Sequence, residues 1–570
     1  MEEQQQQELK NTEQPLIAKP APQQQREVIT IGADSTYVTT DADGYAKPPP
    51  GHDDLGQSEE KYRQKSVAMN YARAFLLAAI IYYPGYYMGI MNPLGGVMTK
   101  DIYKLKTEDE QNDFLGNANL FISGGAMLSY FFIGPLANFF GRVRLVMLSE
   151  LLTLVLAIGY IIHSIEIFYA VRFVSGLVVG ILSGVLPITV SEMFPSSISG
   201  PAGCFCYFSG TTFGLLGYLT PYFFGNNEAL IAKNYKWILI APAFFGVAHL
   251  AAMCVMFKFG SLESPTYFLN KIKPNSEKNR ELLIQNLEKW LSCVYVEEDV
   301  HFYIDEVMLA QIEKEQDKEN PDNAEGLSAL IGPRYRFRFL TVIFLNIAQQ
   351  LSGINFLIFF STALFNKISH NGREMTIVIG AANIMGGVVG IFTISRFGRR
   401  FNMMYGTIVQ IIGFSLLIVG YHFEMNWLLS VAVVSYMISF AVGLGGTMGL
   451  FCAEIVPATA VGIGGGLQWL FTSLVGKLLP GLNDSLGPTV LILFFIAMMV
   501  LTVIYINYAC IETMGLSRED TELIYKGGTT EDGKNHHFSL FKFGSNTTGK
   551  RRLSDQYEAG EREFVHQKRE

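Results

Sequence analysis

The chain has 570 residues, of which 49% are hydrophobic and only 16% are charged, and its formal net charge is −8 at pH 7. This composition, with a mean hydropathy of +0.25, is typical of a polytopic membrane protein and argues against a soluble enzyme. The acidic balance comes largely from the two tails and one loop, so we expect no nucleic-acid partner.

Both ends of the chain are polar. Residues 1–66 are rich in Gln, Pro and Asp and contain few large apolar residues. Such a segment cannot bury enough apolar surface to fold alone, so we predict a disordered N-terminal tail. Residues 512–570 are predicted to form a C-terminal tail.

Between the tails, apolar stretches of about 20 residues recur, and each can cross a roughly 30 Å hydrocarbon core as a helix. We predict an all-α membrane protein with twelve spans, six in residues 67–257 and six in residues 339–511. An even number of spans places both termini on one side of the membrane. The predicted spans lie near 71–91, 116–137, 145–163, 168–191, 203–223, 237–257, 339–365, 375–395, 403–422, 427–450, 463–482 and 489–511.

A polar region, residues 258–338, separates the two sets of spans. Apolar residues recur there every three or four positions over 277–291 and 303–319, which predicts two amphipathic helices in a cytoplasmic linker. The two sets also resemble each other: GPLANFFGRVR (134–144) matches GIFTISRFGRR (390–400), and SEMFP (191–195) matches AEIVP (453–457). Internal duplication of this kind is typical of transporters built from repeats.

Arginines cluster at span ends on the face that carries the termini. The positive-inside rule makes this face cytoplasmic, although lysines on the other face, such as Lys100 and Lys233, weaken the count. The sequence does not identify the membrane, and the plasma membrane is our expectation. The clusters are Arg142 and Arg144; Arg334, Arg336 and Arg338; and Arg396, Arg399 and Arg400.

Five motifs follow one another in a recognisable order. They are GYYMGIMNP (85–93), RFVSGLVVGI (172–181), SLESPTYFL (261–269), QQLSGIN (349–355) and IETMGLSREDTELI (511–524). In these motifs, and over about residues 71 to 523, the chain resembles the sugar porters of the major facilitator superfamily, particularly the facilitative hexose transporters. The resemblance implies two six-helix bundles around a midplane site that faces each side of the membrane in turn.

The polar residues of QQLSGIN lie inside a predicted span, where they are costly unless they face a cavity or one another. Gln349 and Asn355 are six positions apart, so an unbroken helix would point them well over 90° from each other. The Ser352-Gly353 pair between them is a common place for a helix to bend, and a broken helix could turn both amides toward one cavity. Amides suit a polyol because they donate and accept hydrogen bonds without charge. The alternative is that they only bond between helices.

The resemblance also implies a set of substrate contacts. It assigns sugar contact to the QQLSGIN amides and to Asn383, and it places Gln468 and Trp469 beside them in the eleventh span. Tyr207 stands where the family has a glutamine in the fifth span. The expected substrate-binding residues are therefore Tyr207, Gln349, Gln350, Asn355, Asn383, Gln468 and Trp469.

A second set of residues matches charged positions of the family at cytoplasmic span ends. We expect salt bridges among them to hold the two halves together while the site faces outward, and to break as the halves rock. The alternative is that the cations only follow the topology rule. The expected gating residues are Arg142, Arg172, Glu192, Arg396, Arg399, Arg400 and Glu454.

The chain also departs from the family pattern. Proton-coupled sugar porters have an aspartate where this chain has Tyr87, and Glu150 is the one plausible carboxylate that we find within a span. Transport without a coupled proton is therefore favoured. Gly449 replaces a tryptophan in the tenth span, and the few prolines of GLGGTMG (443–449) favour a straighter helix than the family has.

We therefore expect a facilitative carrier of a hexose or a related polyol, and Tyr207 and Gly449 leave the identity of the sugar open. The alternatives are a proton-coupled symporter of hexose or inositol, and a non-transporting sugar sensor or subunit of a membrane complex. We expect no enzyme activity, cofactor or metal. The partners should be the sugar and the lipid bilayer, with the protein acting as a monomer.

Overall fold

The computed structural model describes most of the predicted membrane region and little of the tails. The described residues are 62–225, 227–272, 276–317, 330–332, 335–358, 372–514, 516, 521 and 524–525. The tails predicted over 1–66 and 512–570 lie mostly outside these residues, as does the second part of the predicted seventh span.

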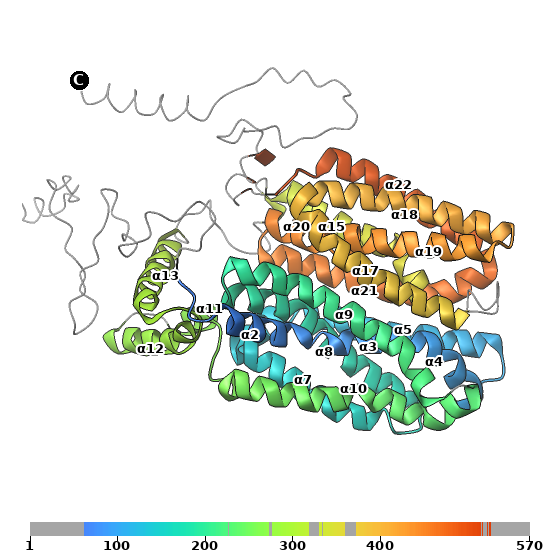
Figure 1. Cartoon of the computed structure of the whole chain (residues 1–570), viewed down its shortest axis with the longest axis horizontal. Helices are drawn as coiled ribbons and strands as arrows, with labels where there is room; N and C mark the ends of the chain where they lie inside the picture. Colours follow the sequence, from blue (N-terminus) through green and yellow to red (C-terminus); the bar gives the residue numbers. More distant parts are fainter. Residues whose placement is uncertain are drawn as a thin grey trace, which may run out of the picture.

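The helices form two bundles that lie side by side (Figure 1). We call them the first and second bundles; each has its own buried apolar core. The first bundle contains α2 (Val67–Ala79), α3 (Tyr82–Gly89), α4 (Met91–Val97), the π-helix η1 (Met98–Ile102), α5 (Glu108–Tyr130), α6 (Ile133–Phe140), α7 (Arg142–Gly159), α8 (Ile165–Met193), α9 (Ser196–Phe224) and α10 (Glu228–Met256). The second contains α15 (Arg336–Gln350), α17 (Gly372–Phe397), α18 (Arg399–His422), α19 (Asn426–Phe440), the π-helix η4 (Ala441–Gly445), α20 (Met448–Ile455), α21 (Ala458–Leu486) and α22 (Pro488–Ala509).

Within the described ranges, the helices account for the twelve predicted spans. Eight helices or joined helices are long and apolar enough to cross a membrane, and the bent pair α5 and α6 makes a ninth. The long helices α7, α9 and α21 lie among them and are richer in small or polar residues. The first span is longer than predicted, because α2, α3, α4 and η1 together run from Val67 to Ile102.

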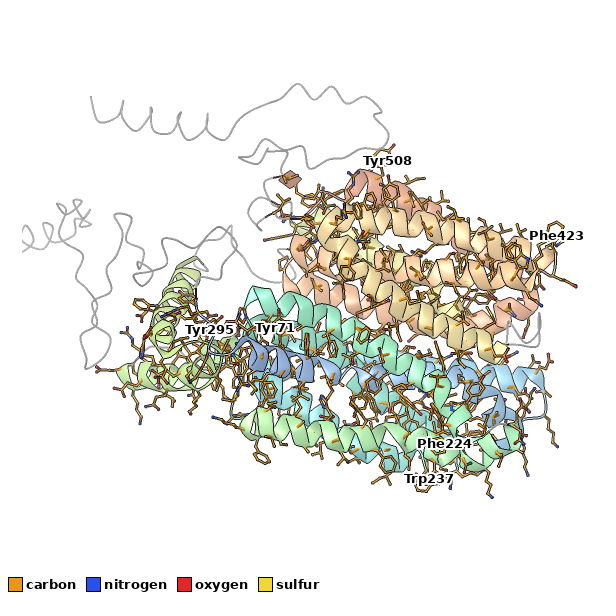
Figure 2. All side chains as sticks on the ribbon, viewed as in Figure 1. Tyr71, Phe224, Trp237, Tyr295, Phe423 and Tyr508 are labelled. Carbon is orange, nitrogen blue, oxygen red and sulfur yellow. The ribbon has the colours of Figure 1, made fainter. Side chains whose placement is uncertain are left out.

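The outer surface of the bundles is apolar. The side chains of Trp237, Phe423 and Tyr508 point outward in Figure 2 and are more than half exposed. Aromatic residues with this exposure would be costly in water, whereas a bilayer accommodates them. This surface agrees with an integral membrane protein.

Three helices of the linker lie at one end of the bundles, which we call the linker end (Figure 1). They are α11 (Pro265–Lys271), α12 (Glu277–Val294) and α13 (Glu297–Asp317), so both predicted amphipathic helices are present. The indole Nε1 of Trp290 on α12 donates to the carbonyl of Met193, which is the last residue of α8, at 2.9 Å. The Trp290 ring also packs between Phe194 and Phe257. The linker is therefore fixed to the first bundle.

The two bundles meet along two antiparallel helix pairs, α5 with α21 and α9 with α17. Along the first pair, Ser473 donates to Ser123 at 2.9 Å, and Lys477 forms an ion pair with Asp113 at 2.7 Å. Both contacts lie between the middle of the bundles and the end opposite the linker. These two contacts along α5 and α21 hold the bundles together in that half of the molecule.

Candidate functional site

The helix of the QQLSGIN motif breaks where the sequence predicts. α15 ends at Gln350, and Gly353 has a φ of +91°, which glycine adopts easily. A side chain at Gly353 would also collide with Phe414 and Phe495, since a Cβ there would lie 2.7 Å from both rings. The carbonyl of Ser352, freed by the break, accepts a hydrogen bond from the Tyr436 hydroxyl at 2.9 Å. Irregular backbone inside a membrane requires such a partner.

The break brings the three amides of the motif together. Asn355 Nδ2 donates to Gln350 Oε1 at 2.6 Å, and Gln350 Nε2 donates to Gln349 Oε1 at 3.1 Å. Thr472 on α21 also donates to Gln350 Oε1, at 2.9 Å. Each amide side chain is buried, with 4–5% of the residue exposed. We call these four residues the amide cluster; Gln350 is its centre, because it makes three of the bonds.

The tenth span passes beside the amide cluster. Gln349 Nε2 donates to the carbonyl of Leu444 at 2.7 Å, and Leu444 lies in η4. This span runs continuously from α19 through η4 to α20, and Gly446 and Thr447 keep right-handed helical backbone angles. Its departure from a regular α-helix is the π-helical segment η4, which contains Gly443 and Gly445, and glycine weakens a regular helix.

The other expected contact residues lie on neighbouring helices. The Tyr207 hydroxyl on α9 donates to Asn383 Oδ1 on α17 at 2.9 Å, so this bond joins the two bundles. Trp469 on α21 is partly buried and packs against the core of the first bundle. The backbone carbonyl of Gln468 accepts a hydrogen bond from the hydroxyl of Thr472. This bond connects the turn of α21 that contains Gln468 to the amide cluster. All the expected contact residues thus come from helices that line the junction of the bundles or border it.

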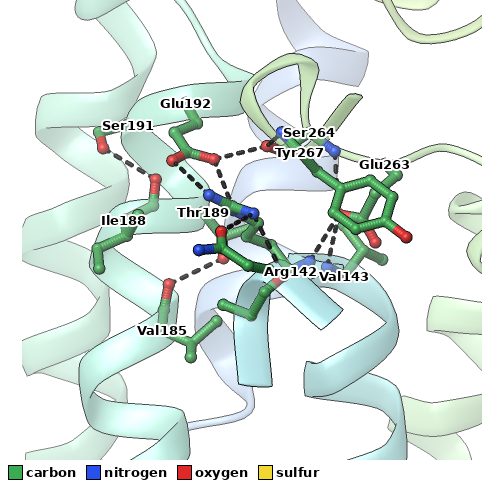
Figure 3. Close-up of polar contacts among 12 residues, drawn as sticks. Arg142, Val143, Val185, Ile188, Thr189, Ser191, Glu192, Glu263, Ser264 and Tyr267 are labelled. Atoms are coloured by element: carbon green, nitrogen blue, oxygen red, sulfur yellow. Dashed lines mark hydrogen bonds and ion pairs between the residues drawn. The ribbon is translucent and has the colours of Figure 1, made fainter. Parts of the chain in front are cut away.

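A charged cluster closes the linker end of the first bundle (Figure 3). Arg142 Nε donates to Glu192 Oε2 at 3.0 Å, and Ser264 donates to the same oxygen. Glu263 is fully buried, and its carboxylate accepts the backbone N–H groups of Arg142, Val143 and Arg144, the first residues of α7, at 2.9–3.2 Å. A carboxylate at this position caps the helix and favours its dipole. Burial raises the pKa of Glu263, and the backbone donors oppose that shift.

The second bundle repeats this arrangement. Arg399 donates to Glu454 at 2.8 Å, and the carboxylate of Glu512 accepts the backbone N–H groups of Arg399 and Arg400 at the start of α18. Gly398 has a φ of +88°, and the matching Gly141 has a φ of +96°. A Cβ at Gly398 would lie about 2.5 Å from the Glu512 carboxylate, so glycine is required there to admit the cap. The duplication seen in the sequence is thus also a duplication of hydrogen bonds.

The arrangement differs from the expected latch between the halves. Arg142 pairs with Glu192 inside the first bundle, and Arg399 pairs with Glu454 inside the second. These pairs tie the start of one helix to the end of another within a bundle, so in this structure they do not join the bundles. Arg396 is exposed and lies over the ring of Phe397.

Arg172 does not belong to the cytoplasmic set. It lies twenty positions before Glu192 on the unbroken helix α8, which separates the two residues by about 30 Å. Its guanidinium is buried and donates to the carbonyl of Tyr87 at 2.7 Å. Counting residues along α8 would have revealed this, because one span cannot have both ends on the same face. Arg172 therefore supports the backbone of the first span.

Glu150, the carboxylate in the third span, forms a buried pair with His249. The Nδ1 atom of His249 on α10 lies 2.8 and 2.9 Å from the two oxygens of Glu150, and its Nε2 lies 2.8 Å from the carbonyl of Leu76 on α2. A carbonyl only accepts, so Nε2 carries a hydrogen, and one proton is shared between Nδ1 and the carboxylate. The pair is buried and neutral overall, and it ties three spans of the first bundle together.

Replacement of Glu263 by Ala should destabilise the protein, because three N–H groups at the start of α7 would lose their acceptor. We expect the free energy of unfolding to fall by about 1–3 kcal/mol. The measurement is the midpoint of thermal unfolding in detergent. The control is Glu298→Ala, because Glu298 forms an ion pair with Arg63 but is largely exposed; such pairs contribute about 0–1 kcal/mol. Equal shifts for the two variants would contradict the capping role.

Several residues of these sites were not found from the sequence. Glu263 and Glu512 lie in two of the quoted motifs. Each follows the last span of its half, and this equivalence could have indicated a shared structural role. His249 was overlooked, although a histidine and a carboxylate inside two spans of one half suggest a pair. The hydroxyl of Thr472 carries no signal of its own in the sequence.

Comparisons with known proteins agree with this architecture. Residues 72–525 match the family model described as "Sugar (and other) transporter". Human solute carrier family 2, facilitated glucose transporter member 5, is 25% identical over 488 residues, which cover 80% of this chain and 92% of that protein. Plastidic glucose transporter 4 of Arabidopsis thaliana is 25% identical over 469 residues, 79% of each chain.

Solved structures show the same fold. The proton:xylose symporter XylE, a major facilitator superfamily protein solved with 6-bromo-6-deoxy-D-glucose, has a TM-score of 0.65 at 19% identity and covers 80% of this chain and 98% of its own. The inward open conformation of XylE from E. coli has a TM-score of 0.63 at 18% identity. These likenesses place the chain in the major facilitator fold of twelve helices.

Proposed function

This chain belongs to the sugar (and other) transporter family, and we propose that it is a facilitative carrier of a monosaccharide or a related polyol. As an integral, multi-pass membrane protein, it would expose its site to each side of the membrane in turn. Both relatives described above are named as glucose transporters, and facilitated glucose transporter member 5 suggests a hexose as the first substrate class to test.

The observation that carries the proposal is the amide cluster at the helix break. Its members satisfy one another with hydrogen bonds that sugar hydroxyls could replace one for one, since a hydroxyl both donates and accepts. Uncharged amides also avoid the cost of a bare charge at this depth. We propose that Gln349, Gln350 and Asn355, with Asn383, Gln468, Trp469 and Tyr207, line the path of the sugar.

Two observations favour transport without a coupled proton. Tyr87, at the position of the family aspartate, has a hydroxyl that donates to the carbonyl of Leu239 at 2.6 Å. Glu150, the alternative proton carrier, is enclosed with His249 between α2, α7 and α10 and has no contact with the amide cluster. A proton held in this pair would have no direct path to the sugar.

The sidedness of the protein is part of the proposal. We propose that the linker end faces the cytoplasm, because the arginine clusters at 142–144 and 396–400 lie there. Both termini would then be cytoplasmic, and the plasma membrane is the proposed location. The paired carboxylates and arginines of each bundle would stabilise the helix ends on that side while the bundles rock as units.

The experiment that tests this function is uptake of labelled hexoses and inositol into proteoliposomes, with and without a pH gradient. We expect saturable uptake that is insensitive to an uncoupler. Stimulation by an inward proton gradient would contradict uniport and favour the symporter. Absence of uptake of every solute by protein that is folded would favour the sensor or subunit.

A further inference from the structure

The hydrogen bond between Tyr207 and Asn383 joins the two bundles at a place where the proposed path of the sugar runs. The hydroxyl of Tyr207 donates to Asn383 Oδ1 at 2.9 Å. Both residues are partly buried. The Tyr207 ring lies against Gly387, one turn along α17 from Asn383, where a Cβ would approach its Cδ1 and Cε1 atoms to 3.3 Å.

The surroundings connect this bond to the amide cluster. Gly386 on α17 lies against Ala441, at the start of η4, and Gln349 donates to Leu444 in the same segment. The segment η4 therefore lies between Asn383's helix and the amides. Asn383 and Gln349 thus lie on helices that contact the same segment of the tenth span, and under the proposed function both line the path of the sugar.

We propose that the Tyr207 hydroxyl acts as a built-in substitute for a sugar hydroxyl, a role that rests on the proposed transport function. Without sugar, the Tyr207 hydroxyl donates its hydrogen bond to Asn383 Oδ1 and so holds α9 against α17. A hydroxyl of an incoming sugar donates to the same oxygen and breaks the bond between the two helices. Tyr207 is thus a specificity-determining residue, because only a sugar with a hydroxyl at this position recovers the bond that is lost.

The physical basis is the exchange of one hydrogen bond for another. Binding must break the Tyr207–Asn383 bond before the sugar gains its own, so the internal bond raises the apparent KM. The same tie resists relative movement of the bundles in the empty carrier, because it crosses the interface at which they move. Exchange of sugar across the membrane should therefore be faster than net transport, in which the carrier must return empty.

The test is Tyr207→Phe, which removes the hydroxyl and keeps the ring against Gly387. We expect the KM for hexose uptake to fall roughly five-fold, the equivalent of one hydrogen bond, and the ratio of exchange to net flux to fall with it. In an Asn383→Leu background the same substitution should leave KM unchanged. The control is Tyr235→Phe, whose hydroxyl contacts His163 away from the junction.

An unchanged or raised KM in Tyr207→Phe would overturn the inference. An equal fall in KM in the Asn383→Leu background would also overturn it.

A second experiment needs no sugar, so its result distinguishes failure of this inference from failure of the proposed transport function. Leu215 and Gly380 face each other across α9 and α17, so L215C and G380C should form a crosslink in a background without other cysteines. We expect Tyr207→Phe to lower the crosslinking yield at least two-fold; an equal yield would show that no tie exists, whether or not sugar is carried.

Discussion

The variant His249→Ala is expected to lower the free energy of unfolding by about 3–5 kcal/mol, because it removes the partner of a buried carboxylate. Glu150 has no exposed surface, and His249 is the group that contacts both of its oxygens. The substitution would also leave the carbonyl of Leu76 without its donor. The midpoint of thermal unfolding of the purified protein in detergent measures the effect.

Two variants complete this experiment. Glu150→Leu combined with His249→Leu removes both polar groups and should recover most of the loss, because a buried ion pair replaced by apolar residues of similar size is often neutral. His163→Ala is the matched control, since His163 is exposed and contacts Tyr235 from the surface. A shift for His249→Ala no larger than that of His163→Ala would show that the pair does not tie the spans. Uniport further requires that the double variant keeps its uptake.

Replacement of Gln350 by Leu should reduce the kcat/KM of sugar uptake roughly 30- to 150-fold. Gln350 accepts from Asn355 and Thr472 and donates to Gln349, so the loss of its amide removes the centre of the cluster. The expected range corresponds to two hydrogen bonds to the sugar of about 1–1.5 kcal/mol each. Initial rates of labelled hexose uptake in proteoliposomes, at equal amounts of folded protein, give the measurement.

The chain offers a matched control for this substitution. Gln410 on α18 is also a fully buried glutamine inside a span, but neither of its amide atoms has a hydrogen-bond partner among the described residues. Gln410→Leu should therefore leave uptake unchanged. Thr472→Val removes one donor and keeps the shape, so its expected loss is less than ten-fold. If Gln350→Leu and Gln410→Leu gave the same uptake, the amide cluster would not be the site.

The helices could be predicted from the sequence because the signals for them are local. A bilayer requires about 20 apolar residues for each span, so run length indicates the spans without knowledge of their neighbours. The linker helices α12 and α13 follow from the same kind of pattern, and the break at Gly353 follows from a residue pair. The π-helical segment of the tenth span was not predicted, because its glycines also occur in regular spans.

The ion pairs of the charged residues could be predicted only in part. Arginines and carboxylates at equivalent points of the two halves indicated pairs, and Arg142 with Glu192 and Arg399 with Glu454 are such pairs. The sequence did not show that each pair stays within its own bundle. The expectation that they join the bundles rested on the family's mechanism rather than on distance.

The sequence by itself determined the class of molecule: twelve spans in two related halves, with amides inside a span and motifs of a sugar transporter family. Run length, duplication and motif order are properties of neighbouring residues, so they are visible before folding. Only the tertiary structure decided which polar groups meet, since Glu150 and His249 are 99 positions apart and Tyr207 and Asn383 are 176 apart. An unpaired polar side chain is costly inside a membrane, and the packing of the helices decides which polar groups can pair.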